Sequence, residues 1–181
     1  MLVQTFSQIK NSKVHKLMIL IVMMLFISAC KPAATTYRPP DHNEIIAFIK
    51  DQGITPVVDK LLDDSIVLLY ENTTSFGYYT LTVREPEGKP AMNHCVSAMK
   101  SDQPILIIGQ MSGNKPFLAV IIQDTALLAE TTAIEVAIDS QNRLTATTNG
   151  QKGVILVSPS PVNDWGTITL YNAQGKILYR Q

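Results

Sequence analysis

The fold of this chain is decided by the stretch IVLLYENTTSFGYYTLTVR, which occupies residues 66–84. Its first part, Ile66 to Tyr70, is a short apolar run with the composition of a β-strand. A polar turn follows at Glu71 to Ser75, and Phe76 to Arg84 then alternates in the manner of a second strand. Because aromatic or aliphatic side chains fall on both faces near the start of this second strand, we expect it to be covered on both sides there.

Further short strands are predicted at regular spacing from Gln103 onward. Turn sequences separate most of them, and the hairpin around Asn172 to Gly175 is the clearest in the chain. Such spacing is typical of a β-sandwich or barrel, and an immunoglobulin-like sandwich is one candidate. The strands expected in this region are Ile105–Gly109, Phe117–Gln123, Ala133–Ile138, Leu144–Thr148, Val154–Val157, Thr167–Tyr171 and Lys176–Tyr179.

A short helix is predicted from Asp41 to Gln52. Asp41 is a suitable N-cap, Glu44 completes a capping box, and Gly53 is a natural stop. The next segment, Ile54 to Leu62, fits either a second helix or a strand, and Met92 to Met99 shows only a weak pattern. The sequence therefore predicts a mainly β protein of the α+β class, in which an N-terminal helix packs on a small antiparallel sheet.

The N-terminus has the pattern of a secretory signal peptide. A basic lead with three lysines precedes the apolar run Leu17 to Ile27, and small residues follow directly. From Leu17 to Cys30 the chain is shorter than the roughly 18–20 apolar residues that cross a membrane. The sequence Ile27-Ser28-Ala29-Cys30 resembles a bacterial lipoprotein signal. This resemblance implies that the thiol of Cys30 receives a diacylglyceryl group and that residues 1–29 are removed.

This interpretation sets the organisation that we expect for the rest of the chain. Residues 30–40 are rich in proline and are predicted to be an extended tether that holds the domain off the bilayer. The lipid on Cys30 would attach the protein to the cell membrane, with the domain on the extracytoplasmic side. Residues 41–101 are expected to contain the helix and the small sheet, and residues 102–181 the sandwich-like half. Whether the two parts form one domain stays open.

The charge balance argues against nucleic acid as a partner. The full chain has 15 basic and 15 acidic residues, and the predicted leader contains three lysines and no acid, which leaves 12 basic and 15 acidic residues. Such a balance provides no basic surface for nucleic acid and little attraction to anionic lipids. If Cys30 carries lipid, Cys95 is the one remaining cysteine, so no intrachain disulfide is expected.

The sequence assigns no catalytic residue. His94 and Cys95 are an adjacent base and thiol, but neighbours on a strand point to opposite faces, which disfavours a catalytic pair. We expect Cys95 to be a buried structural residue. Asp59, Asp63 and Asp64 lack the spacing of a calcium loop, and no metal site or cofactor is predicted.

Aromatic side chains are the remaining candidates for ligand contact. Trp165 lies in a predicted loop and is expected to be partly exposed, and Tyr78 is a second candidate for lining a carbohydrate or peptide groove. The leading hypothesis is a non-enzymatic, lipid-anchored envelope protein whose β-rich part contacts another protein or an envelope polymer. Two alternatives stay open: a small solute-binding lipoprotein, or a membrane-tethered hydrolase that combines His94 with a distant aspartate.

Overall fold

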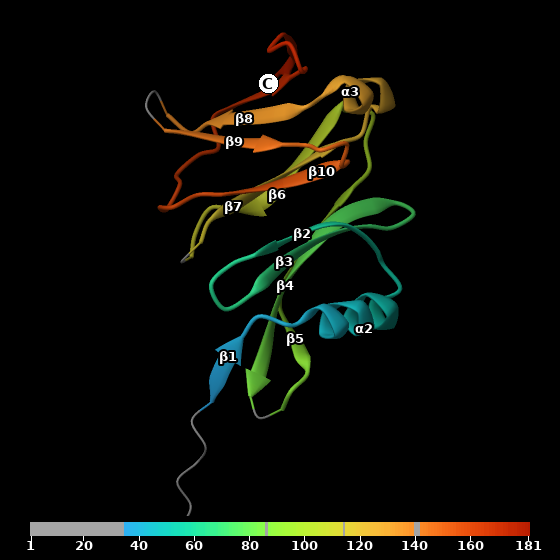
Figure 1. Ribbon diagram of the computed structural model, residues 1–181, viewed down its shortest axis with the longest axis vertical. Helices are drawn as coiled ribbons and strands as arrows, with labels where there is room; N and C mark the ends of the chain where they lie inside the picture. The colour runs from blue at the N-terminus through green and yellow to red at the C-terminus, as the bar shows by residue number, and fades with distance from the viewer. Residues whose placement is uncertain (1–34, 86, 114, 140–141) are drawn as a thin grey trace, which may run out of the picture. The chain divides into compact units, whose positions relative to one another are not determined.

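Three antiparallel sheets and two helices make up the part of the chain that the structure describes. It is a computed structural model and describes residues 35–85, 87–113, 115–139 and 142–181. The predicted leader and Cys30 lie outside these residues. Residues 36–181 form one compact unit. The mainly β prediction is confirmed (Figure 1).

The first sheet, called sheet A here, is built around the stretch quoted first. Its central strands pair in the predicted antiparallel hairpin, with Tyr70 opposite Gly77. Their neighbours lie on both sides, in the order β1-β4-β3-β2, with β5 also paired to β4. The elements are β1 (Thr36–Arg38), α2 (His42–Gln52), β2 (Thr55–Leu61), β3 (Ile66–Glu71), β4 (Ser75–Glu85) and β5 (Pro90–Met99).

The C-terminal half contains two further sheets that face each other. Sheet B has the order β10-β7-β6 and sheet C the order β12-β11-β8-β9. All seven strands lie at or within a few residues of their predicted bounds. The elements are β6 (Ile105–Gln110), β7 (Phe117–Ile122), α3 (Thr125–Glu130), β8 (Ala133–Ala137), β9 (Arg143–Thr147), β10 (Gly153–Val157), β11 (Thr167–Tyr171) and β12 (Ile177–Arg180).

The strand order of sheets B and C is that of an immunoglobulin-like sandwich with one strand exchanged. Counted in chain order, the first, second and fifth strands form one sheet, and the third, sixth and seventh lie together in the other. This is the arrangement of immunoglobulin constant-type domains. The fourth strand, β9, pairs with the third instead of the fifth. The sandwich-like prediction for this half is therefore confirmed.

Sheet B is the middle layer, and both of its faces are buried. Every residue of β7 is buried, because its side chains alternate between two hydrophobic cores. Val120 lies in the core shared with sheet C, whereas Ala119 and Ile121 lie in the core shared with sheet A. A strand covered on both faces is apolar throughout instead of alternating. Sheet C, sheet B and sheet A thus form successive layers, which can be followed from top to bottom in Figure 1.

Helix α2 forms a fourth layer on the outer face of sheet A. Phe48 and Ile49 pack on a core that includes Tyr79 of β4, and the rings of Phe48 and Tyr79 meet edge to face at 5.2 Å. The predicted capping box is present, since Asp41 accepts from the Glu44 amide and Glu44 accepts from the Asp41 amide. β4 is therefore covered on both sides, as its sequence predicts.

The structure corrects the predicted tether at its C-terminal end. Thr36–Arg38 form β1, which pairs antiparallel with the last residues of β4. The Arg38 guanidinium donates to both carboxylate oxygens of Glu44 at 2.7 Å and to Glu85 at 3.0 Å. These bonds hold β1 against both α2 and β4. Residues 36–38 of the expected tether therefore belong to the folded domain.

Three other segments have a secondary structure that the sequence left ambiguous or did not predict. The ambiguous segment after Gly53 is a strand, β2, with a bulge after Pro56. The weakly patterned segment, Met92 to Met99, belongs to strand β5. A bulge in β5 opposite Thr80 and Leu81 interrupts the alternation of its side chains between the two faces, which explains the weak pattern. α3 was not predicted; Asp124 caps it by accepting from the Leu127 amide.

Candidate binding groove at three sheet edges

A groove lies where one edge strand of each sheet comes to the surface. β2 is an edge strand of sheet A, β10 of sheet B and β9 of sheet C. The hollow between them has a volume of about 650 Å³ and is open to solvent. We call it the edge groove. Its lining residues are Val58, Asp59, Lys60, Ala133, Thr145, Ala146, Thr147, Gln151, Val154 and Ile155.

The edge groove has an apolar floor and polar walls. Val154 and Ile155 are buried residues of β10 and form part of the two hydrophobic cores. Thr145 and Thr147 of β9 are exposed, as are Asp59 and Lys60 of β2. Such a surface can bury a small apolar side chain on the floor while hydroxyl, carboxylate and ammonium groups bind polar atoms around it.

Unpaired strand edges add backbone hydrogen-bonding groups to this site. A strand at the edge of a sheet has a row of amide and carbonyl groups that can pair with another extended chain. β2 and β9 each have one unpaired edge in the described sheets. Two charged side chains in β2, and Arg143 in β9, limit indiscriminate pairing at these edges.

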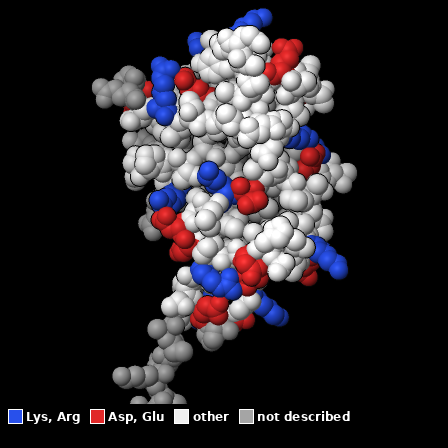
Figure 2. All heavy atoms as spheres, in the orientation of Figure 1, with Lys and Arg blue, Asp and Glu red and all other residues white. Residues whose placement is uncertain are grey.

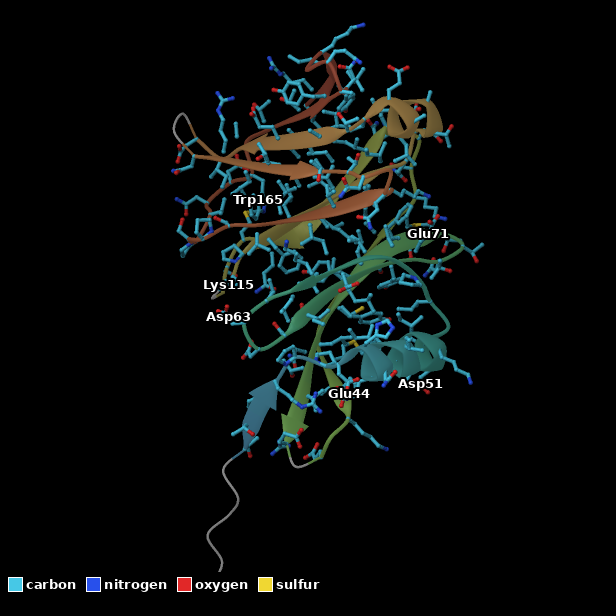
Figure 3. The ribbon with its side chains drawn as sticks, viewed as in Figure 1. Glu44, Asp51, Asp63, Glu71, Lys115 and Trp165 are labelled. Atoms are coloured by element: carbon cyan, nitrogen blue, oxygen red, sulfur yellow. The ribbon has the colours of Figure 1, made fainter. Side chains whose placement is uncertain are left out.

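The two aromatic candidates for ligand contact differ in their outcome. Tyr78 is fully buried between sheets A and B, and its ring meets Phe117 edge to face at 4.9 Å. The prediction for Tyr78 is therefore wrong, because the face of β4 that carries it is the face covered by sheet B. Trp165 lies between β10 and β11, is partly buried and packs against the core of the sandwich. Ligand contact at Trp165 stays a prediction. Figure 3 shows where the Trp165 side chain lies.

Cys95 is exposed, which overturns the prediction of a buried thiol. Its sulfur lies 3.9 Å from the Tyr70 hydroxyl. The Tyr70 ring is stacked on that of Tyr79, with centroids 4.7 Å apart. Burial, followed by interaction with Cys95, raises the pKa of both phenols. Both rings belong to the core on which α2 packs, so the pair has a packing role.

The hydrolase alternative requires His94 to meet an aspartate, and the backbone does not favour this. His94 lies on β5 and Asp59 on β2, which are separated by β4 and β3. Three strand spacings correspond to about 14 Å. Asp63, in the turn after β2, pairs with Lys115 at 3.3 Å. The sheet thus places the backbone of His94 three strands away from that of Asp59.

Two features of the described ranges concern metal ions and membranes. Among these residues there is no cluster of three or more His, Cys, Asp or Glu side chains arranged to hold a metal ion. Over the same residues, no helix has the length and hydrophobicity needed to cross a bilayer. Comparison with protein-family models, curated proteins and solved structures gives no match.

No local sequence signal predicts the edge groove. Val58 and Thr145 are far apart in the chain, and each belongs to a short strand of ordinary composition. Their proximity arises because three sheets stack with one edge of each on the same side. Whether a strand lies at the edge of a sheet depends on the whole topology, which the sequence does not reveal. The sequence therefore indicates only aromatic residues as candidates for ligand contact.

Proposed function

We propose that this chain is a lipid-anchored protein of the bacterial cell envelope that binds an extended peptide segment of another protein in the edge groove. The anchor is the diacylglyceryl group on Cys30, supported by the sequence Ile27-Ser28-Ala29-Cys30 and the apolar run before it. In this proposal the described domain faces the extracytoplasmic side and acts by binding, without catalysis.

The observation that carries the binding proposal is the meeting of three edge strands along one groove. An extended peptide can pair its backbone with β2 or β9, and every second side chain then points toward the apolar floor. None of the described lining residues is aromatic, so the groove lacks the flat apolar surface that a sugar ring would cover. A peptide therefore fits the lining better than a carbohydrate.

The anchoring part is tested by intact-mass analysis of the full chain purified from membranes. We expect the mass of residues 30–181 with a diacylglyceryl modification, and an unprocessed precursor from the Cys30→Ala variant. A wild-type chain that keeps residues 1–29, or that lacks lipid at Cys30, would contradict the anchor.

The binding part is tested by selecting peptides from a display library against the full chain in detergent micelles. Thr147→Arg should abolish binding of the selected peptides, because it places a long charged side chain in the groove. Thr167→Arg is the matched control, since Thr167 is also an exposed strand threonine but is not among the lining residues. Equal binding by both variants, with unchanged circular dichroism, would exclude the edge groove as the site.

A further inference from the structure

The first step concerns β10, whose free edge lies inside the edge groove. β10 has β9 of sheet C on one side and β2 of sheet A on the other (Figure 1). In sheet B it pairs with β7, and its second edge has no partner strand among the described residues. Val154 and Ile155 of this strand line the groove. A chain that enters the groove can therefore reach the backbone of β10.

The second step concerns the direction of the backbone groups along β10. At one end of its ladder with β7, the Ile122 amide donates to the Lys152 carbonyl at 2.8 Å. At the other end, the Ser158 amide donates to the Pro116 carbonyl at 2.8 Å. Bonded and unbonded pairs alternate along an antiparallel ladder. The amide and carbonyl groups of Ile155 therefore point away from β7 and into the groove.

The third step compares this edge with the edges of β2 and β9. Counted in the same way from the bonds at the ends of these strands, the groove-lining residues with outward backbone groups are Asp59, Thr145 and Thr147. These three residues are exposed, whereas Ile155 is only 7 % exposed. Water already solvates exposed backbone groups, but a buried amide or carbonyl without a partner costs free energy. The edge that gains most from an added strand is therefore that of β10.

The fourth step concerns charge. The five residues of β10, GVILV, include no charged side chain, in contrast to Asp59 and Lys60 in β2 and Arg143 in β9. Figure 2 shows acidic and basic side chains interspersed over the visible face, without a large patch of one sign. The side chains of a strand added to β10 would alternate between the β2 side, lined by Val58, and the β9 side, lined by Ala146. Such a site favours an uncharged segment.

We infer that the bound peptide forms a fourth strand of sheet B, paired with the free edge of β10 through the backbone of Ile155. Its central residues are uncharged and have small or β-branched apolar side chains. This inference rests on the proposed binding of a peptide in the edge groove. It selects β10 as the pairing strand and makes β2 and β9 the walls of the site.

The first test measures amide hydrogen exchange by NMR on the full chain in detergent micelles, with and without a peptide selected from the display library. In the free protein, the Ile155 amide should exchange faster than the amides of its two neighbours, which are bonded to β7. With free peptide at about 100 times its Kd, exchange of the Ile155 amide should slow by about 100-fold, because the amide opens only after the peptide leaves.

The second test modifies the peptide, so that the fold of the protein is not at risk. One backbone nitrogen at a time is methylated along the peptide, and the unmodified peptide is the control. Only every second amide of a paired strand faces its neighbour. Methylation should therefore abolish binding at alternate positions and leave it nearly unchanged at the positions between. An equal effect at all positions would overturn strand pairing.

The pattern of protected amides separates failure of this inference from failure of the proposed function. Protection at Asp59, or at Thr145 and Thr147, with none at Ile155, would place the peptide on β2 or β9. This result overturns pairing with β10 and keeps the edge groove as the site. If the Arg variants at positions 147 and 167 bind the selected peptides equally, the groove is excluded and both proposals are overturned.

Discussion

The Lys152 ammonium donates to both carboxylate oxygens of Glu71, at 3.0 and 3.1 Å, and so joins the chain entering sheet B to the end of β3 in sheet A. Lys100, just after β5, lies 2.6 Å from the same carboxylate. Both ammonium groups also lie over the Phe76 ring, at 4.8 and 5.1 Å from its centre. Partial burial alone would raise the pKa of Glu71, but the two lysines outweigh it and hold this pKa below its ordinary value.

Glu71→Gln should therefore destabilise the protein, by about 1 kcal/mol, because two ammonium groups lose their shared counter-charge. Glu130→Gln is the control, since Glu130 is an exposed residue of α3. The free energy of unfolding from urea titrations measures both. An equal effect of the two substitutions would show that the charge of Glu71 contributes nothing to the contact between sheets A and B.

Arg38→Met should loosen β1, because it removes the bidentate pair with Glu44 and the bond to Glu85. We expect faster amide hydrogen exchange in β1 and a loss of about 1 kcal/mol in the free energy of unfolding. Arg84→Met is the control, because its pair with Glu87 is between two exposed side chains and should be worth little. Unchanged protection of β1 in Arg38→Met would mean that backbone pairing alone holds the strand.

The attachment of β1 should also weaken in acid. Hydrogen bonding to Arg38 lowers the pKa of Glu44 to about 2, against an unfolded value near 4.5. A carboxyl group with a lowered pKa stabilises the folded state above the unfolded pKa, and this contribution disappears as the pH falls from about 4.5 to about 2. The protection factors of the β1 amides, which correct for the intrinsic exchange rate at each pH, should therefore fall over this range more in the wild type than in Arg38→Met. Identical acid profiles would contradict the proposed role of Glu44.

The elements that the sequence predicts correctly are those whose causes are local. The capping box needs only Asp41 and Glu44, and the final hairpin needs only its turn and flanking strands. The strand at Phe117–Gln123 is likewise predicted from its own residues, whereas the two sheets that cover it follow only from the assembled fold.

The elements that the sequence misses depend on distant partners. Thr36–Arg38 are a strand because β4 extends beyond β3 and because Arg38 finds two carboxylates. β5 is hidden by its bulge, and Tyr78 resembles an exposed aromatic until sheet B is placed over it. The edge groove has the same origin, since three strands become edges only when all sheets are assembled.

Cys95→Ser should change the free energy of unfolding by no more than about 0.5 kcal/mol, because the side chain is exposed. A maleimide should react with Cys95 in the native protein at the rate of an ordinary free thiol. The control is the same reaction in denaturant, where any protection by the fold is lost. A native reaction far slower than this control would restore the earlier expectation of a buried thiol.

The sandwich assignment makes a sharp distinction between two residues of the last hairpin. Leu170 of β11 is fully buried in the core between sheets B and C, whereas Ile177 of β12 is 44 % exposed. Leu170→Ala should cost 2–5 kcal/mol (an order-of-magnitude range) through lost burial and the cavity left behind, and Ile177→Ala should cost about 1 kcal/mol or less. Thermal and urea unfolding measure both values.

Because the cores on the two faces of sheet B share the residues of β7, Leu170→Ala should lower the stability of the whole described unit in one transition. A separate early transition, with sheet A still folded, would show that the sandwich is a domain of its own.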